Sequence, residues 1–172
     1  MNNKLFIFCG IPFSGKSTLT KEVAKQKGYT RIDLDEVKFK LYGNDVQDAS
    51  LRQEDWDTIY QAMYQEIEAA LKSGSTVVHD TGNFTQYERG LVRQIADKLH
   101  VGAMTVFIDT PEAIARGRLL ANRQTNDRFN VTDQEFEEAV AEMEPPDENE
   151  PHFLYKYPEA ADAWLQKHFA QS

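Results

Sequence analysis

The stretch GIPFSGKS, residues 10–17, constrains the fold of this chain more than any other feature of its sequence. It has two glycines five positions apart, with a lysine and a serine directly after the second. The apolar run KLFIFC (4–9) precedes it, and a segment of helical periodicity (17–27) follows it and ends at Gly28. A buried strand, a tight turn and a helix are therefore predicted in immediate succession.

The rest of the chain alternates between strand-like and helix-like periods. Further strands are predicted at 29–35, 75–80, 102–109 and 152–157. Helix starts are predicted where capping patterns occur, at Ser50 with Gln53, Thr85 with Glu88, Thr110 with Pro111, and Thr132 with Glu135. This alternation predicts an α/β fold, a parallel sheet with helices on both faces, in which ligands bind at the carboxyl ends of the strands.

Composition narrows the class of protein. The length of 172 residues predicts one domain spanning 1–172, and the net charge of -9 gives no general attraction to nucleic acid or to anionic lipid. No leader pattern and no long apolar run is present, so we expect a soluble, cytoplasmic protein. The single cysteine, Cys9, lies in an apolar run and is expected to be a buried core thiol.

The residues of the glycine-containing turn match the phosphate-binding pattern G-x-x-x-x-G-K-[ST]. Backbone N–H groups of such a turn, together with the start of the helix, converge on a phosphate chain. Lys16 is predicted to reach the terminal phosphates and Ser17 to bind Mg²⁺. The predicted nucleotide-binding set is Gly10, Ser14, Gly15, Lys16, Ser17 and Thr18.

Carboxylates follow two of the predicted strands. Asp33 and Asp35 end the second strand, and Asp35 is the candidate general base toward an attacking hydroxyl. The alternative is that Asp35 caps the next helix, and one residue can perform both roles. Asp80 ends the run VVHD and is predicted to hold Mg²⁺ together with Ser17. His79 is interpreted as a partly buried structural histidine. Asn83 either binds an acceptor or organises its loop.

An arginine-rich segment, about 115–131, is predicted to form a lid. An arginine delivered by a mobile segment neutralises the charge that develops during phosphoryl transfer. The alternative is a solvated helix face whose arginines pair with Glu112 and Asp127. Arg123 is the preferred catalytic candidate; the other lid arginines are Arg116, Arg118 and Arg128.

A long helical stripe is interpreted as scaffold. Apolar and aromatic residues recur at three- and four-residue spacing in the segment 56–71, which is typical of a core-facing helix. For Tyr42, Trp56 and Tyr60, the spacing leaves open whether they stack on a ligand ring or fill the core.

The order of motifs resembles that of small AAA-type P-loop kinases, a group that includes polynucleotide 5'-hydroxyl kinases, zeta toxins and chloramphenicol phosphotransferase. The resemblance rests on GIPFSGKST, DLDEVK, VVHDTGN and RGRLLANR, in this order. It implies a three-layer α/β/α P-loop NTPase fold of the nucleoside-monophosphate-kinase type, with strand order 2-3-1-4-5. It also implies that Asp35 is the base, that Lys16, Ser17 and Asp80 serve the phosphates and metal, and that the lid arginine falls at or near Arg123. Asn83 becomes a substrate- or metal-site residue.

One departure concerns the acceptor. Polynucleotide kinases tend to carry an arginine three residues after the base, whereas this chain has Lys38, which we expect to contact the acceptor without a bidentate fork. The absence of an N-K-x-D pattern favours ATP over GTP. The expected function is transfer of the γ-phosphate of ATP, with Mg²⁺, to a hydroxyl of a small molecule, a nucleoside-like compound or a nucleic-acid 5' end. The alternative is a nucleotide-dependent switch or binding module with slow hydrolysis.

Overall fold

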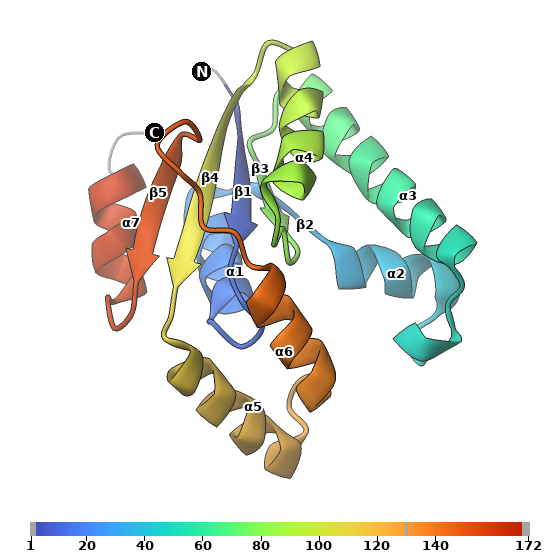
Figure 1. Ribbon diagram of the computed structural model, residues 1–172. Coiled ribbons are helices and arrows are strands. Elements are labelled where there is room, and N and C mark those ends of the chain that lie inside the picture. The colour runs from blue at the N-terminus through green and yellow to red at the C-terminus, as the bar shows by residue number, and fades with distance from the viewer. Residues whose placement is uncertain (1–2, 130, 170–172) are drawn as a thin grey trace.

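The computed structural model describes residues 3–129 and 131–169 and centres on one parallel sheet (Figure 1). Its strands run in the order β2-β3-β1-β4-β5, as predicted. Each neighbouring pair is parallel, for example with Leu5 beside Val77 and Ala103. The strands are β1 (Lys4–Cys9), β2 (Thr30–Asp33), β3 (Val77–Asp80), β4 (Gly102–Asp109) and β5 (His152–Lys156).

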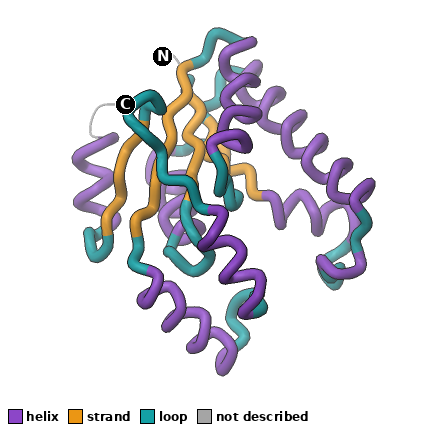
Figure 2. Tube along the Cα trace, viewed as in Figure 1, coloured by secondary structure: helices purple, strands orange, loops and turns teal. Residues whose placement is uncertain are grey.

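Helices cover both faces of this sheet, so the predicted three-layer arrangement is confirmed (Figure 2). The side chains of Leu5 and Ile7 pack toward α3 and α4, whereas those of Phe6 and Phe8 pack toward α1 and α7. The period-2 alternation of β1 thus feeds two separate cores. The helices are α1 (Lys16–Lys27), α2 (Leu34–Tyr42), α3 (Gln53–Lys72), α4 (Gln86–Lys98), α5 (Glu112–Thr125), α6 (Asp133–Glu142) and α7 (Ala161–Phe169).

A third, smaller core lies beyond the carboxyl edge of the sheet, between α5 and α6 (Figure 1). Helix α5 contains most of the segment, about 115–131, that the sequence predicts to be a lid, and α6 follows that segment. Ala115, Leu119 and Phe136 are fully buried there. Ile11 and Phe13, from the turn after β1, pack against the same cluster. The side chains of that turn therefore pack against α5 and α6, while the backbone of the turn remains available for binding. Residue 130 of the predicted lid lies outside the described residues.

Two predicted helix starts are wrong, and both have local causes. Ser50 does not cap α3, because its hydroxyl donates to the Gln47 carbonyl (2.6 Å) within a short 3₁₀ turn, Asp48–Ser50. The Asp55 carboxylate instead accepts the Arg52 N–H (2.9 Å) at the start of α3.

At α5 the cap position is Pro111 rather than Thr110, whose hydroxyl donates to the Ser14 carbonyl (2.8 Å). The capping boxes of Thr85 with Glu88 and Thr132 with Glu135 are confirmed.

Strand β2 is shorter than predicted, since Leu34 already belongs to α2. Cys9 is fully buried, as expected, and burial raises the pKa of its thiol to about 12, which leaves it unreactive at neutral pH. None of the helices among residues 3–129 and 131–169 combines the length and apolar character needed to cross a membrane.

Candidate functional site

The turn between β1 and α1 has the backbone of a phosphate-binding loop. Gly15 has φ +101°, a conformation that other residues rarely adopt, and a Cβ there would lie 3.4 Å from Arg118 Nη1. At Gly10 a Cβ would lie 3.0 Å from both Ile108 Cβ and Ser14 Oγ. Both glycines of the pattern are thus required by the geometry of the loop, and the N-terminus of α1 follows directly.

Asp80 and Ser17 form an oxygen pair next to Lys16. Ser17 Oγ lies 3.4 Å from Asp80 Oδ1, and Lys16 Nζ lies 3.9 Å from the same oxygen. Mg²⁺ usually binds through one or two protein oxygens plus waters and phosphate oxygens, so this pair fits the ion. The parts of the chain that the structure describes contain no group of three or more His, Cys, Asp or Glu side chains able to hold a metal on its own.

The other oxygen of Asp80 is saturated by two neighbours that the sequence did not single out. Oδ2 accepts from Thr20 Oγ1 (2.6 Å) and from Arg31 at Nε (3.0 Å) and Nη2 (2.6 Å). Burial opposes the charge of Asp80, but Lys16, Thr20 and Arg31 together hold the pKa of this carboxyl below its usual value. Asp80 is therefore ionised and oriented with Oδ1 toward Ser17.

Asp33 and Asp35 differ in role. Asp33 caps α2 by accepting the Glu36 N–H at 3.0 Å, and it also pairs with Arg31. The interpretation of Asp35 as the cap is thus wrong: Asp35 lies in the first turn of α2, with its side chain 61% exposed. Burial and the charge of Asp80 raise the pKa of Asp33. Asp35 does not cap the helix, and it lines the pocket described below.

Lys38 is buried instead of lining the pocket. Its side chain is 1% exposed, and Nζ donates to Asp35 Oδ1 and Asp48 Oδ1, each at 2.7 Å. The rings of Trp56 and Phe129 lie 5.8 Å and 5.3 Å from this ammonium. Its geometry is that of a group that holds Asp35 in place, rather than of a direct contact to an acceptor.

Asn83 and His79 form a buried polar pair behind the pocket. Asn83 has a positive φ of 49°, and its amide nitrogen donates to the Phe8 carbonyl (2.8 Å). The same nitrogen lies 3.3 Å from His79 Nδ1, so the proton of the neutral imidazole is on Nε2, which lies 3.3 Å from Met63 Sδ. His79 is fully buried, more than predicted. Asn83 organises its loop, and it also lines the pocket.

A pocket of about 340 Å³ joins these elements. It extends from the phosphate-binding loop to the second and third strand ends and along α3. Several residues of its lining were not expected at a site, among them Asp48, Tyr64, Phe84, Glu88 and Val92. A second pocket, of about 360 Å³, lies between the loop and α5 and is lined by Gly15, Thr18, Arg118 and Arg128 among others.

The lid arginines divide into two groups. Arg118 Nη1 donates to the carbonyls of Phe13 (3.1 Å) and Ser14 (2.9 Å), and Arg128 Nη2 donates to Thr18 Oγ1 (2.9 Å). Arg123 instead donates to the Val131 carbonyl (3.1 Å) and pairs with Asp133 (2.7 Å).

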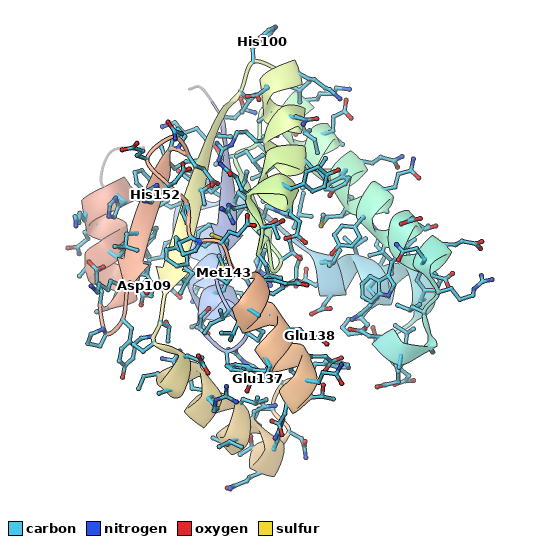
Figure 3. All side chains as sticks on the ribbon, viewed as in Figure 1. His100, Asp109, Glu137, Glu138, Met143 and His152 are labelled. Carbon is cyan, nitrogen blue, oxygen red and sulfur yellow. The ribbon has the colours of Figure 1, made fainter. Side chains whose placement is uncertain are left out.

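Arg116 pairs with Glu112 and with Glu137, which lies on α6 (Figure 3). The structure therefore brings Arg118 and Arg128 to the phosphate-binding loop, whereas Arg116 and Arg123 make contacts within the lid.

Solved structures share this fold at low sequence identity. A putative kinase from Chloroflexus aurantiacus J-10-fl superposes with a TM-score of 0.76 at 17% identity, over 98% of this chain and 100% of that one. Kti12 from Chaetomium thermophilum, in complex with ADP-AlF3, gives 0.73 at 18%, over 96% and 95%. The APS kinase CysC from Mycobacterium tuberculosis, in complex with AMPPNP and APS, gives 0.65 at 19%, over 96% and 95%.

No curated protein matches the sequence significantly. A family model described as "AAA domain", however, matches residues 5–146, which contain the phosphate-binding loop, the strand-end carboxylates and the lid. The chain therefore belongs to this AAA domain family and has the fold of the small P-loop kinases.

Proposed function

We propose that the protein is a kinase that transfers the γ-phosphoryl group of ATP to a hydroxyl of an acceptor. The observation that carries the proposal is one pocket lined by Lys16 and Ser17, from the phosphate-binding loop, and by Asp35, from the first turn of α2. A nucleotide switch needs the loop and Mg²⁺, but it does not need a carboxylate such as Asp35 in the same pocket to accept a proton from an attacking hydroxyl.

The residues divide between donor and acceptor. The loop from Gly10 to Thr18 and the start of α1 bind the phosphates, and Lys16 is directed at the terminal ones. Bound Mg²⁺, held by Ser17 and Asp80, supplies charge neutralisation on the phosphate oxygens. The second pocket, beside Arg118 and Arg128, is the place for the rest of the nucleotide.

Asp35 completes the reaction as general base. The hydroxyl oxygen of the acceptor forms the new bond to the γ-phosphorus while the bond to the bridging oxygen breaks and ADP departs. The hydroxyl proton passes to the Asp35 carboxylate, which Lys38 orients through its 2.7 Å hydrogen bond. The lid arginines stabilise the charge of the transferring group; Arg128 and Arg118 are nearest the loop, and Arg123 holds the lid in shape through Asp133.

The test is a screen of hydroxyl acceptors with γ-labelled ATP and Mg²⁺, including sugars, amino alcohols, nucleosides and 5'-hydroxyl oligonucleotides. Asp35→Asn is expected to lower kcat by about a hundredfold or more while ATP affinity stays within about twofold. Asp57→Asn, an exposed residue of α3, is the matched control. Labelled product from Asp35→Asn at the wild-type rate would refute the assignment of the base, and ATP binding with no phosphorylated acceptor of any class would favour the switch.

A further inference from the structure

A row of aromatic side chains on α3 forms one wall of the pocket. Trp56, Tyr60 and Tyr64 are spaced by four residues, and their ring centroids are 6.4 Å and 6.2 Å apart in tilted pairs. All three line the pocket. The buried stripe of the same helix is a different set, Ile59, Met63, Ile67 and Leu71. The helix expected from its spacing to be scaffold therefore has a core face and a face toward the pocket, and Trp56 and Tyr60, whose role the spacing left open, lie on the second.

The polar atoms of this row have no hydrogen-bond partner among the residues that the structure describes. Within residues 3–129 and 131–169, neither the hydroxyls of Tyr60 and Tyr64 nor the indole N–H of Trp56 makes a hydrogen bond. By contrast, Tyr155 Oη donates to the Glu159 carbonyl (2.7 Å), and Trp164 Nε1 donates to the Leu154 carbonyl (2.8 Å). These polar atoms are open to the pocket rather than sealed in the core, so a ligand in the pocket can bond to them.

Negative charge dominates the same lining. Five carboxylates line the pocket, and among its lining residues the one lysine, Lys16, is directed at the donor phosphates; the carboxylates are Asp33, Asp35, Asp48, Asp80 and Glu88. Two cations that contact these carboxylates from outside the lining do not restore neutrality, since Arg31 is shared by Asp33 and Asp80 and Lys38 by Asp35 and Asp48.

Glu88 lies close enough to the aromatic row to act on it electrostatically. Burial and the charge of Glu88 raise the pKa of Tyr60 to about 12, and the same two causes raise the pKa of Tyr64. One carboxylate oxygen of Glu88 accepts the Thr85 N–H (2.9 Å) in the cap of α4. The pocket lining thus combines the aromatic rings of Trp56, Tyr60 and Tyr64 with the negative charge of Glu88. Aromatic rings and a negative charge are the two features that recognise an ammonium group.

The carboxylates of this pocket would repel an acceptor that carries phosphate or carboxylate, whereas they would attract an ammonium group. The chain supplies an internal example, because the ammonium of Lys38 remains at 1% exposure between two carboxylates, with the Trp56 ring 5.8 Å away. We propose that the acceptor is a cation: a hydroxyl compound that bears a protonated amine and packs an apolar or ring face on Trp56, Tyr60 and Tyr64.

This inference rests on the proposed function and names its substrate class. The amine binds toward Glu88 and the aromatic row, while the hydroxyl lies toward Asp35 and the phosphate-binding loop. The transfer itself is unchanged: the hydroxyl oxygen bonds to the γ-phosphorus, its proton goes to Asp35, and ADP leaves. The amine takes no part in bond making and keeps its proton.

The test compares ring compounds that present an ammonium group, an uncharged amide or a carboxylate: 2-deoxystreptamine and glucosamine, their N-acetylated forms, and glucuronic acid as the anion. We expect kcat/KM for the free amines to exceed that for the N-acetylated forms by about tenfold or more. Glu88→Gln is expected to reduce this preference to about threefold or less, because glutamine keeps the capping box of α4 but loses the charge. Tyr64→Leu is expected to raise KM for the amines. The matched controls are Glu66→Gln, at a partly exposed residue that pairs with Lys40, and Tyr87→Phe, at an exposed residue.

Binding is measured separately from transfer, by calorimetric titration of each probe into the protein loaded with a non-hydrolysable ATP analogue and Mg²⁺. Amine binding that depends on Glu88 supports the inference. If such binding occurs without any transfer, it counts against the kinase proposal. Transfer to neutral or anionic probes with no preference for the amine overturns the inference and leaves the kinase standing. If neither amine binds at millimolar concentration, the inference is overturned on its own.

Discussion

Arg31 donates two hydrogen bonds to a single oxygen of Asp80, from Nε at 3.0 Å and from Nη2 at 2.6 Å. The same guanidinium pairs with Asp33 and with Glu36 (2.5 Å). Because these contacts occupy Oδ2 of Asp80, the oxygen that remains, Oδ1, faces Ser17 and Lys16. One residue of β2 thereby fixes both the charge and the orientation of the carboxylate proposed to hold the metal.

Replacing Arg31 with methionine is expected to destabilise the fold and weaken Mg²⁺-dependent nucleotide binding. The variant leaves Asp80, which is 2% exposed, without the cation that is hydrogen-bonded to it, a change that typically costs about 3 kcal/mol or more of unfolding free energy. Urea unfolding and ATP titration at several Mg²⁺ concentrations measure the two effects. Arg52→Met, at a side chain that is 74% exposed, is the control. Equal stability of the two variants would contradict this role of Arg31.

The features that the sequence predicted are those encoded by contiguous residues. The loop from Gly10 to Ser17 is encoded by its glycines together with the flanking strand and helix. Arg31 was missed because its importance depends on Asp80, which is 49 residues away and adjacent only after β2 and β3 pair. A weak signal existed, since Arg31 and Asp33 share one face of a strand whose neighbour also ends in a carboxylate.

The same reasoning explains why Lys38 was placed in the acceptor site. Its distance from Asp35, three residues, correctly predicts proximity on one helix face. Its burial, however, depends on Asp48, Trp56 and Phe129, which reach it from three separate segments. Sequence spacing predicts which residues of a helix are neighbours, but not whether another segment closes over them.

Lys38→Met is expected to lower kcat by about tenfold or more with ATP affinity changed less than about twofold, since Asp35 would lose the group that orients it. Lys40 lies on the same helix, pairs with Glu66 and has a side chain that is 72% exposed. Lys40→Met is therefore the matched control. Steady-state kinetics with an acceptor that the screen has identified measure kcat and KM, and ATP titration measures the affinity for the nucleotide. If KM for the acceptor rises while kcat stays constant, Lys38 contacts the acceptor directly, as the sequence first suggested.

The lid arginines are expected to respond differently to truncation. Arg128→Ala and Arg118→Ala remove contacts to Thr18 and to the Ser14 carbonyl, so both variants are expected to lose about tenfold or more in kcat/KM for ATP. Arg123→Ala breaks the pair with Asp133, so its main expected effect is on lid order, seen as faster proteolysis between α5 and α6. Asp133→Asn should reproduce that effect. A loss of kcat in Arg123→Ala that Asp133→Asn does not share would make Arg123 the catalytic arginine.

Acid is expected to destabilise the protein through His79. Burial lowers the pKa of His79 to about 4, below the value of 6.5 for the free side chain. The unfolded chain therefore binds a proton between these two values that the folded chain does not. His79 therefore does not reduce the free energy of unfolding above about pH 6.5, but it lowers that free energy by about 3 kcal/mol as the pH approaches 4.

Urea midpoints across this range should fall less steeply for His79→Gln than for the wild type. His100→Asn, at the exposed end of the loop before β4 (Figure 3), should retain the wild-type slope. Parallel slopes for His79→Gln and the wild type would contradict the assignment of this pH dependence to His79.

Arg89 and Glu150 connect the loop after β3 to the segment that leaves the lid. Arg89, 1% exposed, binds both carboxylate oxygens of Glu150, from Nε at 2.8 Å and from Nη2 at 2.9 Å. Its third nitrogen donates to the carbonyls of Asn83 (3.0 Å) and Phe84 (3.1 Å), which border the pocket.

Removing the carboxylate with Glu150→Ala is expected to cost about 3 kcal/mol or more of unfolding free energy, because a buried guanidinium is left without its counter-charge. Since Arg89 also holds the carbonyls of the pocket loop, amide hydrogen exchange in residues 82–85 should quicken more than in β1 or β4. Glu148→Ala, on the exposed part of the same segment, should change neither quantity. Uniform acceleration of exchange across the sheet would mean that Glu150 serves global stability alone, whereas acceleration confined to 82–85 would establish that the pair positions the pocket loop.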